Sequence, residues 1–93
     1  MKDKRSKLQI YYEIAQAVII EMQDNGTTSN TRIQSKCNTS YDKLLRYIDE
    51  MEQKGIIKKG KPIVLTEKGA QFCQNYAKIN ELINEITDRL SQS

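Results

Sequence analysis

Three lysines, Lys58, Lys59 and Lys61, lie within four positions of the sequence, and apolar runs flank them on both sides. Lysine side chains are flexible point charges, so a cluster of them is suited to neutralising phosphate rather than to reading base edges. The flanking residues are β-branched and are interrupted by turn residues, which predicts a short β-hairpin with the lysines at its tip. A charged tip also protects an exposed strand edge and keeps it soluble, so this alternative stays open.

The stretch before the hairpin, residues 41–54, adds a second set of polar side chains on a helical repeat. We expect Arg46 to make bidentate contact with guanine, because its planar guanidinium matches the O6 and N7 acceptors, and Lys43 to contact phosphate. Taken alone, these residues also fit a solvated helix face. We assign Tyr41, Leu44, Leu45, Ile48 and Met51 to the inner face, and Asp42, Lys43, Arg46, Tyr47 and Glu50 to the outer face.

A short helix and a turn precede this stretch, and together they match the helix-turn-helix plan. Residues 31–38 are long enough for only two turns, with Ile33 and Cys37 on one face, and Ser40 can cap the helix that follows. In this plan the second helix enters the DNA major groove with its first turns leading. For Arg32 and Lys36 a solvated surface is an even alternative. The side chains expected to contact DNA are Arg32, Lys36, Thr39, Ser40, Lys43, Arg46, Tyr47, Lys58, Lys59 and Lys61.

A longer helix is expected before this pair, over residues 6–24, where apolar residues follow the helical period for five turns. Asn25-Gly26 supplies the left-handed stop that commonly ends a helix. The segment ahead of it is basic and short. Its cations, which either form an arm along the DNA backbone or belong to a frayed end, are Lys2, Lys4, Arg5 and Lys7.

Thr66 can cap a long final helix, residues 67–91, whose apolar residues alternate at spacings of four and three. This is the a and d pattern of a coiled coil. The stretch from Ile79 to Leu90 covers about 16 Å at 1.5 Å per residue and is expected to run beyond the rest of the domain, so it needs a partner helix. The flanking e and g positions carry almost no charge and fix neither parallel nor antiparallel pairing. The residues of this seam are Phe72, Tyr76, Ile79, Ile83, Ile86 and Leu90.

The composition excludes several classes of function. The chain has 93 residues and a net charge of +3, which are values of one ordinary globular domain. Two cysteines without a histidine leave no ligand set for a metal, and no cofactor is expected. No segment reaches membrane-spanning length. We therefore expect a cytoplasmic protein without catalytic activity and with reduced thiols, while an inter-subunit disulfide through Cys73 stays open.

The stretch "LLRYIDEMEQKGIIKKGKPIVLTEKGAQF" resembles the archaeal winged-helix DNA-binding proteins of about ten kilodaltons that dimerise through a C-terminal antiparallel coiled coil. The similarity runs over nearly the whole chain, and "RYIDEMEQKGII" followed by "LTEKG" is fairly specific for winged helices of this kind. The resemblance implies two winged-helix heads at opposite ends of a rod, binding duplex DNA in nucleoid organisation or transcription regulation.

The expected fold is mainly α with a small β-hairpin, a winged helix-turn-helix followed by a long C-terminal coiled-coil helix. Residues 1–69 are expected to form the DNA-binding domain and residues 70–93 the dimerisation helix. The expected partners are double-stranded DNA and a second copy of the chain. The alternative is a winged-helix module that binds proteins within a transcription or replication assembly.

Overall fold

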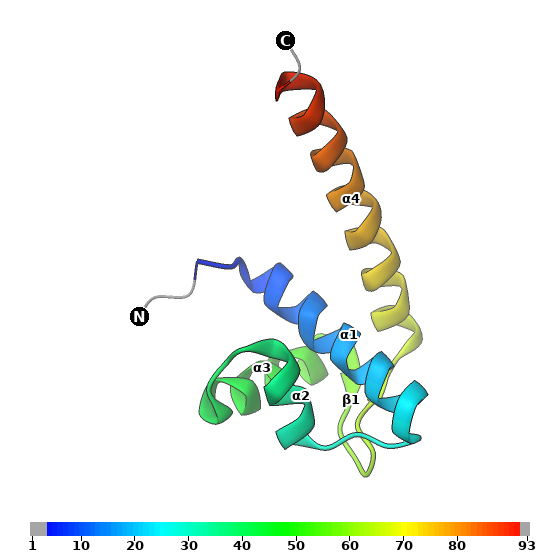
Figure 1. Cartoon of the computed structure of the whole chain (residues 1–93). Helices are drawn as coiled ribbons and strands as arrows, with labels where there is room; N and C mark the ends of the chain where they lie inside the picture. Colours follow the sequence, from blue (N-terminus) through cyan, green and yellow to red (C-terminus); the bar gives the residue numbers. More distant parts are fainter. Residues whose placement is uncertain (1–3, 92–93) are drawn as a thin grey trace.

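Four helices and one short antiparallel hairpin follow each other within residues 4–91, the part of the chain that this computed structural model describes (Figure 1). The order is the one expected from the sequence, and the mainly helical fold with a small hairpin and a long last helix is confirmed. We call α1, α2, α3 and the hairpin the head. The elements are α1 (Lys7–Asn25), α2 (Asn30–Cys37), α3 (Tyr41–Gln53), β1 (Ile57–Lys58), β2 (Val64–Leu65) and α4 (Glu67–Ser91).

Capping residues set where the helices of the head begin and end. Each of α1, α2 and α3 follows a serine whose hydroxyl accepts a hydrogen bond from the backbone N–H three residues later. Gly26 ends α1 with a φ of 70°, a left-handed conformation that suits glycine. Asn38 ends α2 in the same region, with a φ of 52°. The capping residues thus place the boundaries of these three helices within one or two residues of those expected from the sequence.

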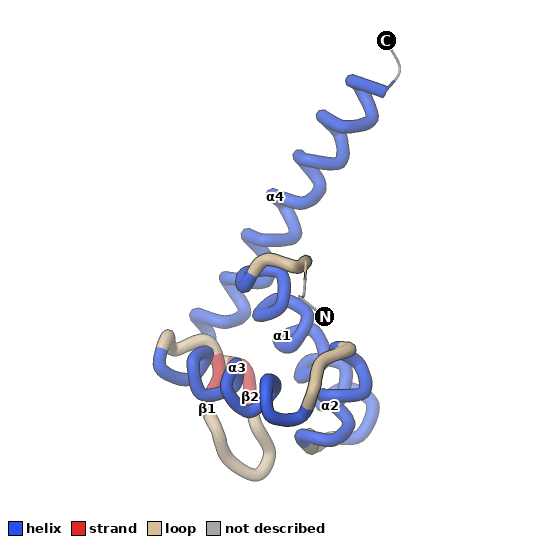
Figure 2. The backbone as a smooth tube through the Cα atoms, turned by 90° about the vertical axis from the view of Figure 1, so that its left-hand side faces the viewer, coloured by secondary structure: helices blue, strands red, loops and turns tan. Residues whose placement is uncertain are grey.

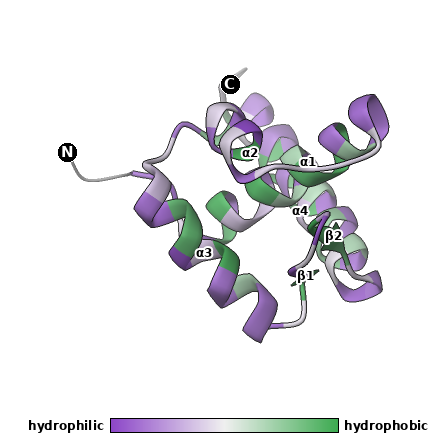
Figure 3. Cartoon of the chain, turned by 90° about the horizontal axis from the view of Figure 1, so that it is seen from below, coloured by the Kyte–Doolittle hydropathy of each residue, from purple (hydrophilic) through white to green (hydrophobic). Residues whose placement is uncertain are grey.

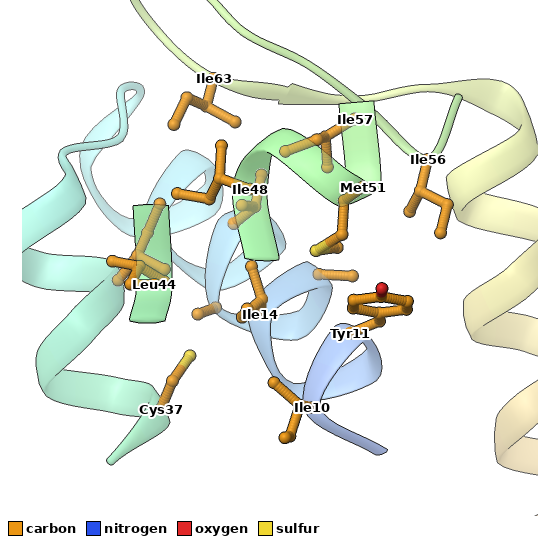
Figure 4. Close-up of a cluster of buried hydrophobic side chains, with 14 of the residues drawn as sticks. Ile10, Tyr11, Ile14, Cys37, Leu44, Ile48, Met51, Ile56, Ile57 and Ile63 are labelled. Atoms are coloured by element: carbon orange, nitrogen blue, oxygen red, sulfur yellow. The ribbon is translucent and has the colours of Figure 1, made fainter. Parts of the chain in front are cut away.

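The core gathers around α1, with side chains from α2, α3 and the hairpin packing onto it (Figure 4). Coloured by hydropathy, α3 carries apolar residues along one side and polar residues along the other (Figure 3). Ile14, Ile33 and Leu44 are fully buried, one each from the first three helices. Burying a side chain of this size stabilises the fold by about 1.5–3 kcal/mol, so the burial of these three side chains helps to hold the helices together.

The hairpin is shorter than the apolar runs suggested, because each strand has two residues, Ile57 pairing with Leu65 and Lys58 with Val64. Lys58 therefore belongs to β1 rather than to the tip. Pro62 lies in the loop between the strands, after a cis peptide bond. Figure 2 shows the loop extending from the head on the side opposite the far end of α4.

The first turns of α4 pack into the head, and the rest of the helix leaves it as a rod (Figures 1 and 2). Tyr76 stacks on Tyr12 of α1 with ring centroids 4.7 Å apart, and Phe72 lies next to Tyr76. The beginning of the seam therefore packs onto α1. Beyond Tyr76 the large apolar side chains of α4 are exposed, from 52% for Ile79 to 72% for Leu90. None of the described helices has the length and apolar character needed to cross a membrane.

Candidate nucleic-acid interface

The turn between α2 and α3 is held by local hydrogen bonds. The Ser40 hydroxyl accepts from the Lys43 backbone N–H at 3.3 Å, as a helix cap does, and Ser40 is exposed. The Gln34 side-chain amide donates to the Thr39 carbonyl at 3.2 Å, and Thr39 is half-buried. Both predicted contact residues of the turn therefore flank the first turn of α3, and their contact with DNA stays a prediction.

Arg5 fixes the same turn from a distance in the sequence. Its guanidinium donates to the carbonyl oxygens of Cys37 at 2.8 Å and Asn38 at 3.1 Å, and it pairs with Glu13 at 3.0 Å. A cation at these carbonyls also suits the negative end of the α2 dipole. Of the basic N-terminal residues, Arg5 is thus docked on the head, while Lys4 is exposed and Lys2 lies outside the described residues.

Two cations of α3 are available at the surface. Arg46 is exposed and Lys43 is partly exposed, and neither forms an ion pair or a side-chain hydrogen bond within residues 4–91. Both lie in the first half of the helix, which the turn and Arg5 hold in place. An unpaired guanidinium and ammonium on a fixed helix are suited to anionic ligands.

Glu50 ties α3 to α1 and is not on the free outer face expected for it. The Tyr11 hydroxyl and the Lys7 ammonium both donate to Glu50 Oε1, the latter at 3.0 Å. These bonds, above all the one from Tyr11, hold the pKa of the Glu50 carboxyl below its usual value. Burial, together with the bond to Glu50, raises the pKa of Tyr11 to about 12. Glu50 is therefore a structural carboxylate.

Tyr47 is also placed differently from the expected outer face. It is half-buried against the core, and its ring meets that of Tyr11 edge-on with centroids 6.3 Å apart. Tyr41 and Leu45, expected inside, are 43% and 37% exposed. The buried side of α3 is therefore centred on Leu44 and includes Tyr47, which turns the Tyr41 and Leu45 side toward solvent.

The hairpin is attached to its neighbours by polar contacts. The Lys59 ammonium pairs with the Asp49 carboxylate, and the Lys59 backbone N–H donates to Glu52 Oε2 at 2.9 Å. Directly before β2, the Thr28 hydroxyl donates to the Ile63 carbonyl at 3.1 Å and accepts from the Ile63 N–H at 2.9 Å. The hairpin is thus anchored to α3 on one side and to the loop before α2 on the other.

The three hairpin lysines consequently have different surroundings. Lys58 and Lys61 are exposed and have no acidic partner among the described residues, whereas Lys59 is neutralised by Asp49. Lys59 also lines an open groove between α3 and the hairpin, together with Leu45 and Ile63. The positive charge free to meet a ligand at the hairpin is that of Lys58 and Lys61.

Arg32 and Lys36 of α2 face a buried carboxylate that sequence reasoning missed. Arg32 Nη1 and Lys36 Nζ each lie 3.7 Å from a carboxylate oxygen of Glu21, whose side chain is 5% exposed. The Asn25 amide donates to the same carboxylate at 3.3 Å. A buried charge needs such partners, so these two cations have a structural role that competes with their predicted phosphate contacts. Glu21 lies between apolar residues of α1, and nothing in that spacing marks it as buried.

Both cysteines are free and buried. Burial raises the pKa of the Cys37 thiol to about 11 and raises the pKa of Cys73 as well. Within the described residues, no group of three or more histidine, cysteine, aspartate or glutamate side chains is placed to hold a metal ion.

The capped helix pair and the hairpin that follows it lie in a segment that matches a known protein family. A family model described as winged helix-turn-helix matches residues 4–84. The chain belongs to the winged helix-turn-helix family. Winged helix-turn-helix domains are typically DNA-binding or regulatory modules without catalytic activity, and this is the class of function that the family supports. The chain matches none of the curated proteins with which it was compared.

The order of elements corresponds to the general plan of a winged helix. Helices α2 and α3 form the helix-turn-helix pair, the hairpin after them is the wing, and α3 stands in the position that is called the recognition helix in this plan. The match continues into α4 past the boundary expected at residues 69 and 70, and Gly69 and Cys73 of α4 are buried in the head. The division into two domains stays a prediction.

Proposed function

We propose that this protein is a homodimer that binds double-stranded DNA through its winged-helix heads, as a cytoplasmic transcription regulator or nucleoid-associated protein. One observation supports this most strongly: four cations of the recognition helix and the adjacent wing have no acidic partner within residues 4–91. Unpaired cations on neighbouring elements suit a polyanion. They are Lys43, Arg46, Lys58 and Lys61.

In this proposal α3 enters the major groove with its capped N-terminal end leading. Arg46 reads guanine through its two parallel N–H groups, and Lys43 neutralises phosphate beside it. Lys58 and Lys61 of the wing contact the backbone next to the groove. Asp49, a carboxylate beside the wing, is compensated by Lys59, which limits its repulsion of phosphate.

The dimer is proposed to form through α4. Ile79, Ile83, Ile86 and Leu90 are between 52% and 72% exposed, and they lie on the part of the helix that leaves the head. Each such side chain contributes about 1.5–3 kcal/mol when a partner helix buries it. A second copy of α4 offers a seam with the same spacing, and two linked heads bind one duplex more tightly than one head does.

The test compares a wing variant with a matched control on the full chain. Replacing Lys58 and Lys61 together with Gln is expected to weaken binding to every duplex by a similar factor. It is also expected to reduce the slope of log affinity against log salt by about 1.8 per bound head, at about 0.9 per lost phosphate contact. The control, Lys78→Gln, removes an exposed lysine of α4 and is expected to change little. Fluorescence anisotropy at several salt concentrations gives both quantities.

An unchanged affinity and slope in the wing variant would argue for the second candidate function, a protein-interaction module. Asp42, an exposed carboxylate in the first turn of α3, favours that candidate, because carboxylates repel phosphate at close approach. Arg46→Ala separates base reading from charge. On a preferred site it is expected to cost about 1–3 kcal/mol, and on scrambled duplex much less.

A further inference from the structure

The exposed apolar face of α4 is wider than the seam proposed for the dimer. By the spacing of four and three, Ile79 and Ile86 occupy d positions of the heptad. Ile83 and Leu90 occupy the a positions. Leu82 is a further large apolar side chain, 58% exposed, and it takes the g position beside the seam. Apolar residues at a and d alone suit a pair of helices, whereas a third apolar position suits a helix with more than one neighbour.

The residue types in the seam also favour more than two helices. In parallel coiled coils leucine at d is typical of two strands, while isoleucine at d, with isoleucine or leucine at a, shifts the preference to three or four strands. Ile79 and Ile86, the d residues beyond the head, are both isoleucine, and the a residues are Ile83 and Leu90. The free part of the seam therefore has the composition of a larger bundle.

The area that two helices can bury supports the same conclusion. Complete burial of one such side chain removes about 60–120 Å² of apolar surface from water. The seam residues beyond the head, Ile79, Ile83, Ile86 and Leu90, therefore supply about 500–1,000 Å² on two chains, less than the about 1,200–2,000 Å² of a stable interface. With Leu82 included, four chains supply about 1,200–2,400 Å².

The charges beside Leu82 indicate which partner fits this face. Lys78 lies four residues before Leu82 and Glu85 lies three residues after it, so the three residues share one side of α4. Both charged residues are exposed, and neither forms an ion pair within residues 4–91. If two copies of this patch meet about a two-fold axis that passes at right angles to α4 near Leu82, the lysine of each copy faces the glutamate of the other. The patch is therefore complementary to itself.

We propose that the patch of Lys78, Leu82 and Glu85 is a second self-association surface of α4, through which two dimers join as a tetramer. Its partner is the same patch on another copy of the chain. This inference rests on the proposed dimer and adds the assembly that the dimer forms. The seam holds each pair of helices together, the patch joins the pairs, and the tetramer carries four heads.

The experiment measures the mass of the full chain by sedimentation equilibrium from low micromolar to millimolar concentration. The unmodified protein is expected to change from two chains to four as its concentration rises. Leu82→Gln is expected to remain at two chains, because it removes the apolar contact between dimers and keeps the seam. The matched control is Leu8→Gln, since Leu8 of α1 is the same residue type and 55% exposed, and it is expected to form the tetramer.

Charge reversal tests the two-fold contact itself. Glu85→Lys places like charges opposite each other and is expected to raise the concentration at which half the protein is tetrameric about fivefold or more, because each contact contains the pair twice. Lys78→Glu is expected to have a similar effect. The double variant, Lys78→Glu with Glu85→Lys, restores opposite charges and is expected to restore the tetramer. All three positions are exposed, so the head should stay folded, which thermal unfolding checks.

The outcomes separate this inference from the proposed function. A mass of two chains at every concentration overturns the inference and leaves the dimer in place. A trimer, or a tetramer that persists in both Leu82→Gln and Glu85→Lys, also overturns it, because the patch then does not form the contact. A monomer at every concentration overturns both the tetramer and the proposed dimer.

Discussion

At Gly69 the backbone of α4 approaches the hairpin so closely that no side chain fits. A Cβ atom there would lie 2.1 Å from the Ile56 carbonyl oxygen and 2.9 Å from Leu65 Cδ1. Thr66, three residues earlier, accepts from the Gly69 N–H at 3.0 Å and donates to the Ile56 carbonyl at 2.9 Å. The "LTEKG" motif therefore joins the wing to α4 through one packed leucine, one cap and one close backbone approach.

Replacing Gly69 with Ala is expected to destabilise the head by about 1–3 kcal/mol or more, since the hairpin and α4 have to separate. The matched control is Gly60→Ala in the wing loop, where the nearest atom to an added Cβ, the Pro62 carbonyl oxygen, is 3.4 Å away. Urea unfolding of both variants measures the difference. Equal stability of the two would mean that the close approach at Gly69 is not a feature of the folded protein.

Tyr11 and Glu50 provide a prediction for pH. The pKa of Glu50 is held below its ordinary 4.5, so the ionised carboxylate stabilises the fold above that pH. This contribution is lost as the pH falls through the lower pKa of the folded state. Tyr11→Phe removes the main cause of the shift and is expected to cost about 1–2 kcal/mol at neutral pH and less in acid. Tyr12→Phe is the control, because the Tyr12 hydroxyl has no hydrogen bond within the described residues.

Urea unfolding at a series of pH values between neutral and strongly acidic measures the Tyr11 effect. A stability difference between Tyr11→Phe and the unmodified protein that does not shrink in acid would contradict the assignment of Glu50 as the partner.

Among the elements, the helix pair was the most predictable from sequence, and the orientation of its second helix the least. Serines before each helix and a left-handed residue after α1 and α2 are local signals, so the boundaries followed from neighbouring residues. The rotation of α3 depends on Tyr11, which lies 39 positions from Glu50 in the sequence and holds it against α1. Periodicity alone therefore placed Tyr41 and Leu45 inside and Tyr47 outside.

The N-terminal segment is a second case in which contacts between residues far apart in the sequence determine the structure. Basic residues at a chain end usually indicate a solvated segment, yet Arg5 reaches two carbonyls at the end of α2. Its partners are 32 and 33 positions away, and no local pattern in the sequence marks Arg5 as a residue that docks on the end of α2. For the same reason, the burial of Glu21 and its pairing with two cations could not be predicted from the sequence.

Arg5→Ala is expected to lower stability by about 1.5–3 kcal/mol, the range for hydrogen bonds to a charged group, and to loosen the turn that positions α3. Lys4→Ala, at an exposed neighbouring position, is expected to change stability by less than about 0.5 kcal/mol. Thermal unfolding gives the stability, and amide hydrogen exchange reports on the turn. If exchange at the first turn of α3 were the same in both variants, Arg5 would have no part in holding it.

The molecule has two parts with different surfaces: the head carries unpaired cations on α3 and the wing, and the projecting part of α4 carries exposed apolar side chains. Its extents of 50 × 32 × 26 Å reflect α4 projecting away from the wing (Figure 1). The seam was predictable because its spacing is a property of one helix. The part of the seam that packs onto the head, where Tyr76 of α4 stacks on Tyr12 of α1, depends on how far α4 runs along α1.

Replacing Ile83 and Ile86 with Gln is expected to yield a monomer with a folded head, because the seam loses apolar area on both chains at once. The control pair, Glu81→Gln with Asn84→Gln, changes exposed positions of α4 outside the seam and should leave the dimer intact. Sedimentation equilibrium at tens of micromolar measures the mass, and an unmodified protein that sediments as a monomer would rule out the dimer.

The most direct test of the account is the salt dependence of duplex binding by the unmodified full chain. Log affinity for a mixed-sequence duplex is expected to fall linearly with log salt. The expected slope is about −2.7 per bound head, from three phosphate contacts at about 0.9 each by Lys43, Lys58 and Lys61. Binding that is absent at low salt, or whose affinity does not change with salt, would contradict DNA as the ligand of this winged helix.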